Sequence, residues 1–408
     1  MLFNFIAIAI PTFGLIVLIL WSVYSISSDT LQKRKAMLTV RAATEIGNSE
    51  LLKKLTLTYN ELSQSKRRSK WRELLIVKVV QESEDVKSFY LVESIDLLPT
   101  SLAGQHILVE REKQPGSLGG FRCYSLSDDC DNGYWRISVK KNSEDANSIS
   151  RWLHEEKGAG DTLKVKGPAG SFYFKPVAGR VPVLVSAGIG ISPMMPMLIE
   201  ALRHNCAEAH FFTQCRDFAH MPFADSLLDI AKKNPQIGMQ IWVSRWPQGV
   251  RRQNGGMFFD GKFQVCDLLR HSGSISLSDY YLCGPEKWQE TLRANLIEAG
   301  VPAAAIRYEL FQQAEKPAPS SKFANHRVHF KQSGAHAKFE SDYSSILTCA
   351  GKTGVELESG CRTGACGSCA VILLKGKVRY TREPQFQMDS NEILPCVCVP
   401  ESDLVVDA

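Results

Sequence analysis

The sequence has little net charge and lacks the motifs of hydrolytic enzymes. Its 48 Lys and Arg residues nearly balance its 43 Asp and Glu residues, which leaves a formal charge of +5, too small to argue for nucleic-acid binding. It contains no serine or cysteine triad, no paired acid and base and no zinc-protease motif, so its chemistry would belong to cofactors. It also has no internal repeat. At 408 residues the chain is long enough for two or three domains.

Four of the 12 cysteines are spaced like the ligands of a plant-type [2Fe–2S] cluster. Cys361, Cys366 and Cys369 form a C-x4-C-x2-C motif, and Cys396 follows further along the chain. Small residues between the first three would let backbone N–H groups point at the sulfurs. Structural zinc sites usually pair two C-x2-C hooks, and disulfide frameworks belong to short secreted chains. An iron–sulfur cluster is therefore the favoured interpretation.

The chain begins with an apolar segment, since residues 3–24 carry no charged side chain. As a helix it would extend about 33 Å, enough to cross a membrane, and it lacks the basic start and A-x-A-like site of a signal peptide. We expect a transmembrane helix in residues 1–25, in contact with lipid, and a basic helical spacer in residues 26–70. The basic cluster that begins at Lys33 predicts a single-pass protein of the inner (cytoplasmic) membrane, with its other domains in the cytoplasm. The spacer is either held against anionic lipid or solvated.

Beyond the spacer, the hydrophobic pattern predicts two domains, a linker and a terminal domain. Residues 71–178 contain short strands separated by turn residues, typical of a small antiparallel β-barrel; the expected strands are 73–80, 88–93, 105–110, 134–140 and 162–166. Residues 179–312 alternate strands with helices, as in a parallel α/β sheet; the expected strands are 181–186, 209–213, 240–244 and 279–283. Residues 313–325 are rich in proline and serine and indicate a linker. Residues 326–408, which contain the four cysteines, form the last domain.

The first domain contains a polar motif suited to a flavin. Arg122 presents a fork for a phosphate, Tyr124 can stack on a flat ring, and Ser125 can hydrogen-bond a ribityl or phosphate oxygen. Alone such a match is weak, but a second segment downstream strengthens it. The candidate residues of that segment are Ser148, Ile149 and Ser150.

The second domain contains a strand–turn–helix segment suited to a dinucleotide. Two glycines would let a pyrophosphate approach the backbone, and the helix N-terminus would supply N–H groups and a positive dipole. The candidate residues are Gly188, Gly190, Ser192 and Pro193. A later strand ends at Cys283, Gly284 and Pro285, at the carboxyl edge where α/β sheets bind ligands. Cys283 would either lie beside that ligand or be a buried structural thiol.

Together these motifs resemble the ferredoxin–NADP reductase superfamily over residues of about 72–408. The order of a flavin domain, a nicotinamide domain and a C-terminal ferredoxin resembles reductases of the phthalate dioxygenase and vanillate demethylase type, and that of the hybrid-cluster protein. The resemblance implies that Arg122, Tyr124 and Ser125 hold the flavin and that residues 148–150 meet its pyrophosphate. It also implies a β-grasp ferredoxin domain whose fourth ligand is Cys396 rather than Cys398.

The resemblance further implies the coenzymes and the residues near them. Ser244 and Arg245 would bind the 2′-phosphate of NADPH, with NADH as the alternative, and Arg216 would lie near the adenosine. The flavin would be FAD, with FMN as the alternative. Cys283 and Glu309 would orient the nicotinamide, while Tyr124 covers the flavin ring; Glu309 could equally be a surface residue at a strand end.

The expected function is that of a membrane-anchored NAD(P)H-dependent oxidoreductase. A flavin accepts two electrons as hydride and releases them singly, as a cluster requires. The acceptor would be a separate protein, such as a membrane-bound oxygenase, hydroxylase or desaturase. The alternatives are a reductase of a soluble metalloprotein or quinone, a redox-sensing or electron-transfer adaptor with little turnover, and a zinc-bearing scaffold.

Overall fold

The computed structural model describes residues 71–93, 98–112, 120–142, 144–145, 148–204, 206, 208–247, 257–271, 275–311, 325–384, 386 and 388–408. All of them belong to the compact unit Arg68–Ala408. The expected membrane helix, the basic spacer and nearly all of the expected linker lie outside the described residues. Within those residues, no helix is both long and apolar enough to span a bilayer.

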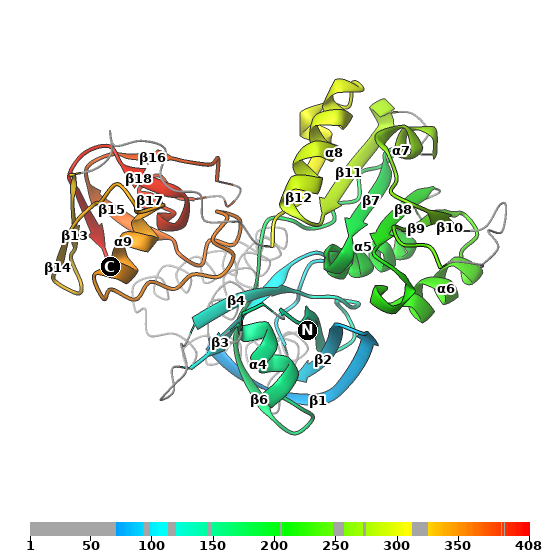
Figure 1. Ribbon diagram of the computed structural model, residues 1–408, viewed down its shortest axis with the longest axis horizontal. Coiled ribbons are helices and arrows are strands. Elements are labelled where there is room, and N and C mark those ends of the chain that lie inside the picture. Colours follow the sequence, from blue (N-terminus) through cyan, green and yellow to red (C-terminus); the bar gives the residue numbers. More distant parts are fainter. Residues whose placement is uncertain are drawn as a thin grey trace, which may run out of the picture. The chain divides into compact units, whose positions relative to one another are not determined.

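The first domain is a closed antiparallel barrel, as the sequence predicts (Figure 1). Its strands are β1 (Trp71–Ser83), β2 (Val86–Val92), β3 (His106–Arg111), β4 (Gly120–Ser125), β5 (Trp135–Lys140) and β6 (Thr162–Ala169). They follow the order β4-β3-β6-β1-β2-β5, and a bridge between Leu126 and Ile137 joins the two ends. Alternate residues of β1, such as Leu74 and Ile76, fill the interior. One helix, α4 (Ile149–Glu156), packs its Leu153 onto this core.

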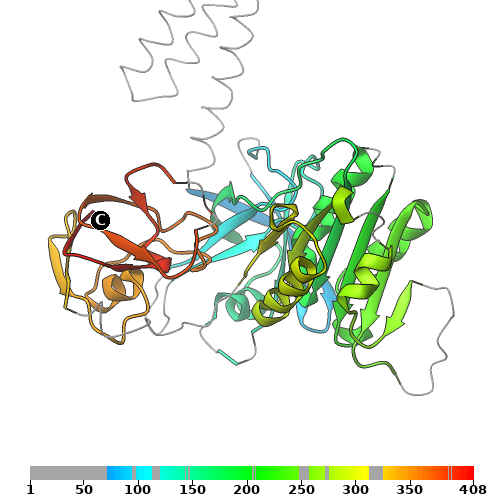
Figure 2. The ribbon, with the colours of Figure 1, turned by 90° about the horizontal axis from the view of Figure 1, so that it is seen from above.

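The second domain is a parallel sheet with helices on both faces, also as predicted (Figure 2). Its strands are β7 (Val181–Ala187), β8 (Ala209–Cys215), β9 (Ile237–Val243), β10 (Phe258–Asp260), β11 (Ser278–Cys283) and β12 (Ile306–Glu309), in the order β10-β9-β8-β7-β11-β12. Its helices are α5 (Ile191–Arg203), α6 (Ala224–Lys233), α7 (Val265–His271) and α8 (Glu286–Glu298). Because strand side chains alternate, Leu184 packs with α5 and α6, whereas Val183 and Val185 pack with α7 and α8.

The last domain is a mixed five-stranded sheet that packs against one helix, α9 (Ile346–Lys352). The sheet has the order β14-β13-β19-β15-β17, and β16 pairs with β18 separately. The strands are β13 (Arg327–Phe330), β14 (Ala335–Lys338), β15 (Val371–Lys375), β16 (Val378–Tyr380), β17 (Glu392–Ile393), β18 (Cys398–Pro400) and β19 (Leu404–Asp407). Helix α9 begins at Ser345, whose hydroxyl accepts a hydrogen bond from the Thr348 N–H. The regular elements hold a long irregular loop between α9 and β15, which contains three of the four candidate ligands.

Candidate functional site

The four candidate cluster ligands come together. Cys361, Cys366 and Cys369 are buried on one loop, and we name residues 360–369 the cluster loop. Cys396 lies on the short 3-10 helix Pro395–Val397, and its sulfur is 3.2 Å from that of Cys369. The backbone N–H groups of Cys361 and Cys366 each donate to the sulfur of the other residue, at 3.4 and 3.3 Å. The sulfurs therefore form two close pairs.

The cluster loop is built to present N–H groups to sulfur. Thr363 N–H donates to the Cys361 sulfur at 3.4 Å, and Ser368 N–H donates to the Cys366 sulfur at 3.5 Å. Gly364 and Gly367 have φ values of +78° and +72°, which side chains rarely adopt, so the loop can curl around the sulfurs. Donors of this kind stabilise thiolate ligands, and four soft sulfurs suit an iron–sulfur cluster.

Cys398 packs in a different part of the last domain's interior. It is fully buried in the apolar core of the last domain, beside Val399 and Ile393. Burial raises the pKa of its thiol well above the usual value. Of the two neighbouring cysteines, only Cys396 lies against the other ligands.

The flavin motif lies on β4, a strand that the sequence pattern did not predict. Arg122 and Tyr124 are half-buried and Ser125 is buried. The Tyr124 hydroxyl is buried and has no hydrogen-bond partner among the described residues. Burial raises its pKa well above the usual value, so the hydroxyl stays protonated. An unpaired buried donor on this strand fits a ligand with polar ring atoms.

The second candidate flavin segment is the N-terminus of α4. The Ser148 hydroxyl accepts from the Arg151 N–H at 3.3 Å and caps the helix. Ile149 and Ser150 form the first turn, and the Ser150 hydroxyl accepts from the Asn142 N–H at 3.1 Å. The helix dipole at this end favours a phosphate.

The glycine turn after β7 lies directly against the end of β11. Gly188 has a φ of +56°, and a Cβ on Gly190 would lie 2.1 Å from the Cys283 carbonyl oxygen. A Cβ on Gly284 would in turn lie 2.8 Å from the Trp288 ring and 3.1 Å from the Ala187 Cβ. The carboxyl ends of β7 and β11 therefore lie so close together that a side chain at residue 190 or 284 would prevent the contact.

Helix α5 begins at this turn. Ser192 and Pro193 are buried in its first turn, and the Ser192 hydroxyl donates to the Ile189 carbonyl at 2.9 Å. Pro193 lacks an N–H that would be unsatisfied there. The turn thus resembles an anion-binding helix N-terminus in its construction.

Cys283 and Glu309 end two adjacent strands and are directly paired in register. Both are buried. Burial, with the nearby Glu309 carboxylate as a smaller cause, raises the pKa of the Cys283 thiol well above its usual value. Gln289 on α8 fixes this edge, because its side-chain amide donates to the Gly284 and Glu309 carbonyls at 2.8 and 2.7 Å.

Ser244 and Arg245, the candidate residues for the 2′-phosphate, meet Arg216, the candidate residue near the adenosine, at the carboxyl edge beyond β8 and β9. Ser244 N–H donates to the Cys215 carbonyl at 3.0 Å, and Arg245 N–H donates to the Arg216 carbonyl at 2.7 Å. Arg245 is exposed, and the Arg216 guanidinium contacts Asp217 at 3.3 Å. The edge therefore presents a serine and two guanidinium groups, which suit a phosphate.

Sequence reasoning missed a buried polar group that joins the three domains. His106, at the start of β3, lies 3.3 Å from the Glu309 carboxylate. Glu309 also accepts a hydrogen bond from the Ser125 hydroxyl at 3.4 Å. The nitrogen of His106 and the sulfurs of Cys123 and Cys366 all lie within 4.8 Å of one another. Although burial disfavours its charged form, the neighbouring Cys366 sulfur and Glu309 carboxylate raise the pKa of His106 to about 9.

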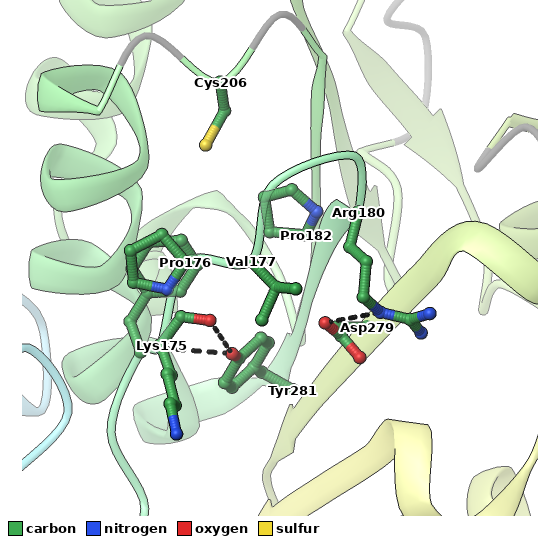
Figure 3. Close-up of a pocket in the computed structure, with 9 residues that line it drawn as sticks. Lys175, Pro176, Val177, Arg180, Pro182, Cys206, Asp279 and Tyr281 are labelled. Atoms are coloured by element: carbon green, nitrogen blue, oxygen red, sulfur yellow. Dashed lines mark hydrogen bonds and ion pairs between the residues drawn. The ribbon is translucent and has the colours of Figure 1, made fainter.

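The pocket of Figure 3 lies at the opposite end of the parallel sheet. It is open to solvent and is lined partly by Pro182 and Asp279, at the beginnings of β7 and β11. Asp279 pairs with the Arg180 guanidinium at 2.8 Å, and the Tyr281 hydroxyl accepts from the Lys175 N–H at 3.3 Å. Ligands of such sheets bind at the carboxyl edge, so this pocket is not the nucleotide site.

Comparison with known proteins covers all three domains. Residues 328–401 match the model of the 2Fe-2S iron-sulfur cluster binding domain. The flavohemoprotein of Chromobacterium violaceum is 32% identical over 251 residues, which are 60% of this chain and 61% of that protein. The flavohemoprotein of Bacillus subtilis is 29% identical over 245 residues, 59% of this chain and 60% of that protein. The chain thus spans about three fifths of these relatives.

Two solved structures have folds similar to parts of this chain. The FAD/NAD binding domain of nitric oxide dioxygenase from Vibrio cholerae is 27% identical with a TM-score of 0.52, covering 59% of this chain and 98% of that one. Phthalate dioxygenase reductase, 24% identical with a TM-score of 0.54, covers 83% of this chain and 98% of its own; this likeness concerns the fold. The chain therefore joins the two-domain fold of flavin- and nicotinamide-dependent reductases to a 2Fe-2S iron–sulfur cluster binding domain.

Proposed function

We propose that this chain is an NAD(P)H-dependent oxidoreductase that passes electrons through a flavin and a [2Fe–2S] cluster to a separate acceptor. The observation that carries the proposal is the pairing of the cysteines, Cys361 with Cys366 and Cys369 with Cys396, with backbone N–H groups aimed at the first pair of sulfurs. Cys361, Cys366, Cys369 and Cys396 would hold the cluster. A bound flavin supplies two-electron uptake and one-electron release.

The barrel residues would hold FAD. Arg122 and the N-terminus of α4, with Ser148 and Ser150, would bind the phosphates. Tyr124 would cover the ring, and its unpaired hydroxyl supports a ligand at this position. The Ser125 hydroxyl donates a hydrogen bond to Glu309, and Ser125 would lie at the edge of the flavin ring. FMN remains the alternative, because these contacts need only one phosphate.

The carboxyl edge of the parallel sheet would bind NADPH in preference to NADH. The turn at Gly188 and Gly190 would receive the pyrophosphate. Ser244 and Arg245 would bind a 2′-phosphate, which an acidic residue would repel. Cys283 and Glu309, paired and buried, would bound the nicotinamide pocket and exclude water from it.

The acceptor would be an oxygenase, hydroxylase or desaturase. One structure with a similar fold is an intact type IV self-sufficient cytochrome P450 monooxygenase, and phthalate dioxygenase reductase is a modular structure for electron transfer from pyridine nucleotides to [2Fe-2S]. The apolar residues 1–25 support an anchor in the cytoplasmic membrane and a membrane-bound acceptor.

The test is to purify the full chain in detergent, measure flavin and iron, and add NADPH without oxygen. We expect a yellow-brown protein with one flavin and two irons, and an EPR signal of a reduced [2Fe–2S] cluster. Cys361→Ala should remove the EPR signal and cytochrome c reduction, yet keep flavin and NADPH-dependent ferricyanide reduction. A colourless wild-type chain, or a loaded chain that NADPH does not reduce, would refute the proposal.

A further inference from the structure

Strand β4 connects the two expected cofactor sites, because its side chains alternate between opposite faces. Tyr124 packs against the core of the barrel. Its neighbour Cys123 faces outward and packs with Cys361 and Cys366 of the cluster loop. Cys123 is thus the sequence neighbour of Tyr124, a candidate flavin residue, and it contacts Cys366, a candidate cluster ligand of another domain.

The contact between β4 and the cluster loop is too close for any side chain at residue 360. A Cβ on Gly360 would lie 2.3 Å from the Cys123 sulfur, 2.6 Å from the Leu108 methyl and 3.4 Å from the Cys366 sulfur. The φ of Gly360 is not positive, so backbone conformation gives no reason for a glycine there. The close approach of the cluster loop to β3 and β4 is the reason for a glycine at this position.

Polar pairs near this contact join the last domain to each of the other two domains. Glu358 accepts hydrogen bonds from Lys166 at 2.8 Å and from the Trp71 indole at 3.2 Å. On the nucleotide side, Arg382 donates to Glu286 at 2.8 Å. These pairs fix where the cluster loop meets the barrel, so the contact of Cys123 with Cys366 is part of a larger interface.

We propose that the Cys123 thiol donates a hydrogen bond to the Cys366 thiolate, and thereby raises the reduction potential of the cluster while the cluster loop is docked on β4. The inference rests on the proposed function, since it assumes the cluster at Cys366. Cys123 is a positioning residue: it acts on the cluster through a ligand.

The sign of the effect follows from charge. A reduced cluster carries one more negative charge than an oxidised one, so a donor to a ligand sulfur stabilises the reduced form more. Cys123 is partly shielded from solvent, which favours the neutral thiol, the form that can donate. Two other donors to Cys366 are backbone N–H groups that no side-chain substitution removes, and the His106 nitrogen, also within 4.8 Å of the Cys366 sulfur, is retained in every Cys123 variant. Cys123 is therefore a side-chain contribution that can be measured separately.

The test is the midpoint potential of the cluster, from EPR-monitored redox titration of the full chain at equal iron and flavin content. Cys123→Ala and Cys123→Val should lower the midpoint potential by at least about 59 mV, which for one electron corresponds to a tenfold change in the oxidised-to-reduced ratio. Cys123→Ser keeps a donor and should stay within a twofold change in that ratio. Cys206→Ala removes another partly buried thiol, away from the cluster loop, and should leave the potential unchanged.

Gly360→Ala tests the same contact from the side of the cluster loop. If Cys123→Ala loses iron, the midpoint potentials of Gly360→Ala and Cys123→Val are compared instead. The methyl group added by Gly360→Ala would push the cluster loop off β4, so the potential should fall as in Cys123→Ala, and the double variant should fall no further. Unchanged potentials in Cys123→Ala and Cys123→Val, or an equal fall in Cys123→Ser, would overturn the inference while leaving the proposed function intact. A wild-type chain without a cluster would instead refute the proposed function.

Discussion

Replacing Gly190 by alanine tests whether the ends of β7 and β11 form the nicotinamide site. The added Cβ would lie 2.1 Å from the Cys283 oxygen, 2.4 Å from its carbonyl carbon and 2.8 Å from the Gly284 nitrogen. All three are backbone atoms, which no rotamer change can move aside. Since ordinary contact begins near 3.4 Å, the strand end must shift by about 1.3 Å (3.4 − 2.1). The φ of Gly190 is −59°, so the effect would come from this contact and not from backbone strain.

The expected size follows from that shift. Overpacking of this kind costs about 1–3 kcal/mol, and every ~1.4 kcal/mol is a factor of ten. If the shift falls on Cys283 and Gly284, kcat/KM for NADPH should fall roughly 10- to 100-fold, in line with the effect of a ~1 Å misplacement. Flavin and iron content should stay normal, because those ligands belong to other domains.

The assay is NADPH-dependent ferricyanide reduction, with flavin content measured on the same samples. Gly158→Ala is the matched control, since a Cβ there meets nothing within 4 Å and its φ is not positive. Gly188→Ala, which has open space within the protein but a φ of +56°, adds backbone strain at the turn that would receive the pyrophosphate. Wild-type kcat/KM in Gly190→Ala would show that this strand end does not bind the nicotinamide.

Four further substitutions separate neighbouring roles. Arg245→Ala should raise KM for NADPH tenfold or more and leave KM for NADH within twofold; equal losses would contradict a 2′-phosphate contact. Cys396→Ser should lose iron, whereas Cys398→Ser should keep iron and lower the unfolding temperature, because a buried hydroxyl without a partner costs about 1–3 kcal/mol; iron analysis with thermal unfolding distinguishes them. Glu358→Ala removes partly exposed contacts to Lys166 and Trp71 worth about 1 kcal/mol or less. Glu358→Ala should slow cluster reduction severalfold in stopped-flow measurements. High salt should slow cluster reduction similarly in the wild type. A rate that does not depend on salt in either protein would rule out this docking contact.

The parts that sequence predicted are those fixed by local pattern. The strands of both sheets lie where apolar residues alternate or run together, as in β1 and β7. The cluster loop was recognisable because metal ligation constrains cysteine spacing directly. The glycine turn after β7 was recognisable because few other residues tolerate its backbone.

The strands that sequence reasoning missed lack such a pattern. β4 is half-buried at every position but the last, since one face meets the barrel core and the other meets the cluster loop. Its polar motif predicted a flavin site but did not predict a strand. β10 and β12 span only three and four residues, too few for periodicity to be visible.

The buried junction of His106, Cys123 and Glu309 could not be predicted from sequence at all, because its members lie far apart in the chain. It explains why Glu309 is buried rather than exposed at a strand end: the His106 imidazole and the Ser125 hydroxyl both contact its carboxylate. A buried carboxylate left without partners would be costly, so the end of β12 is tied to β3 and β4 of the barrel. The cluster loop reaches the same point through Cys366. The three domains therefore share one buried polar contact region, beside the candidate flavin motif and the cluster loop.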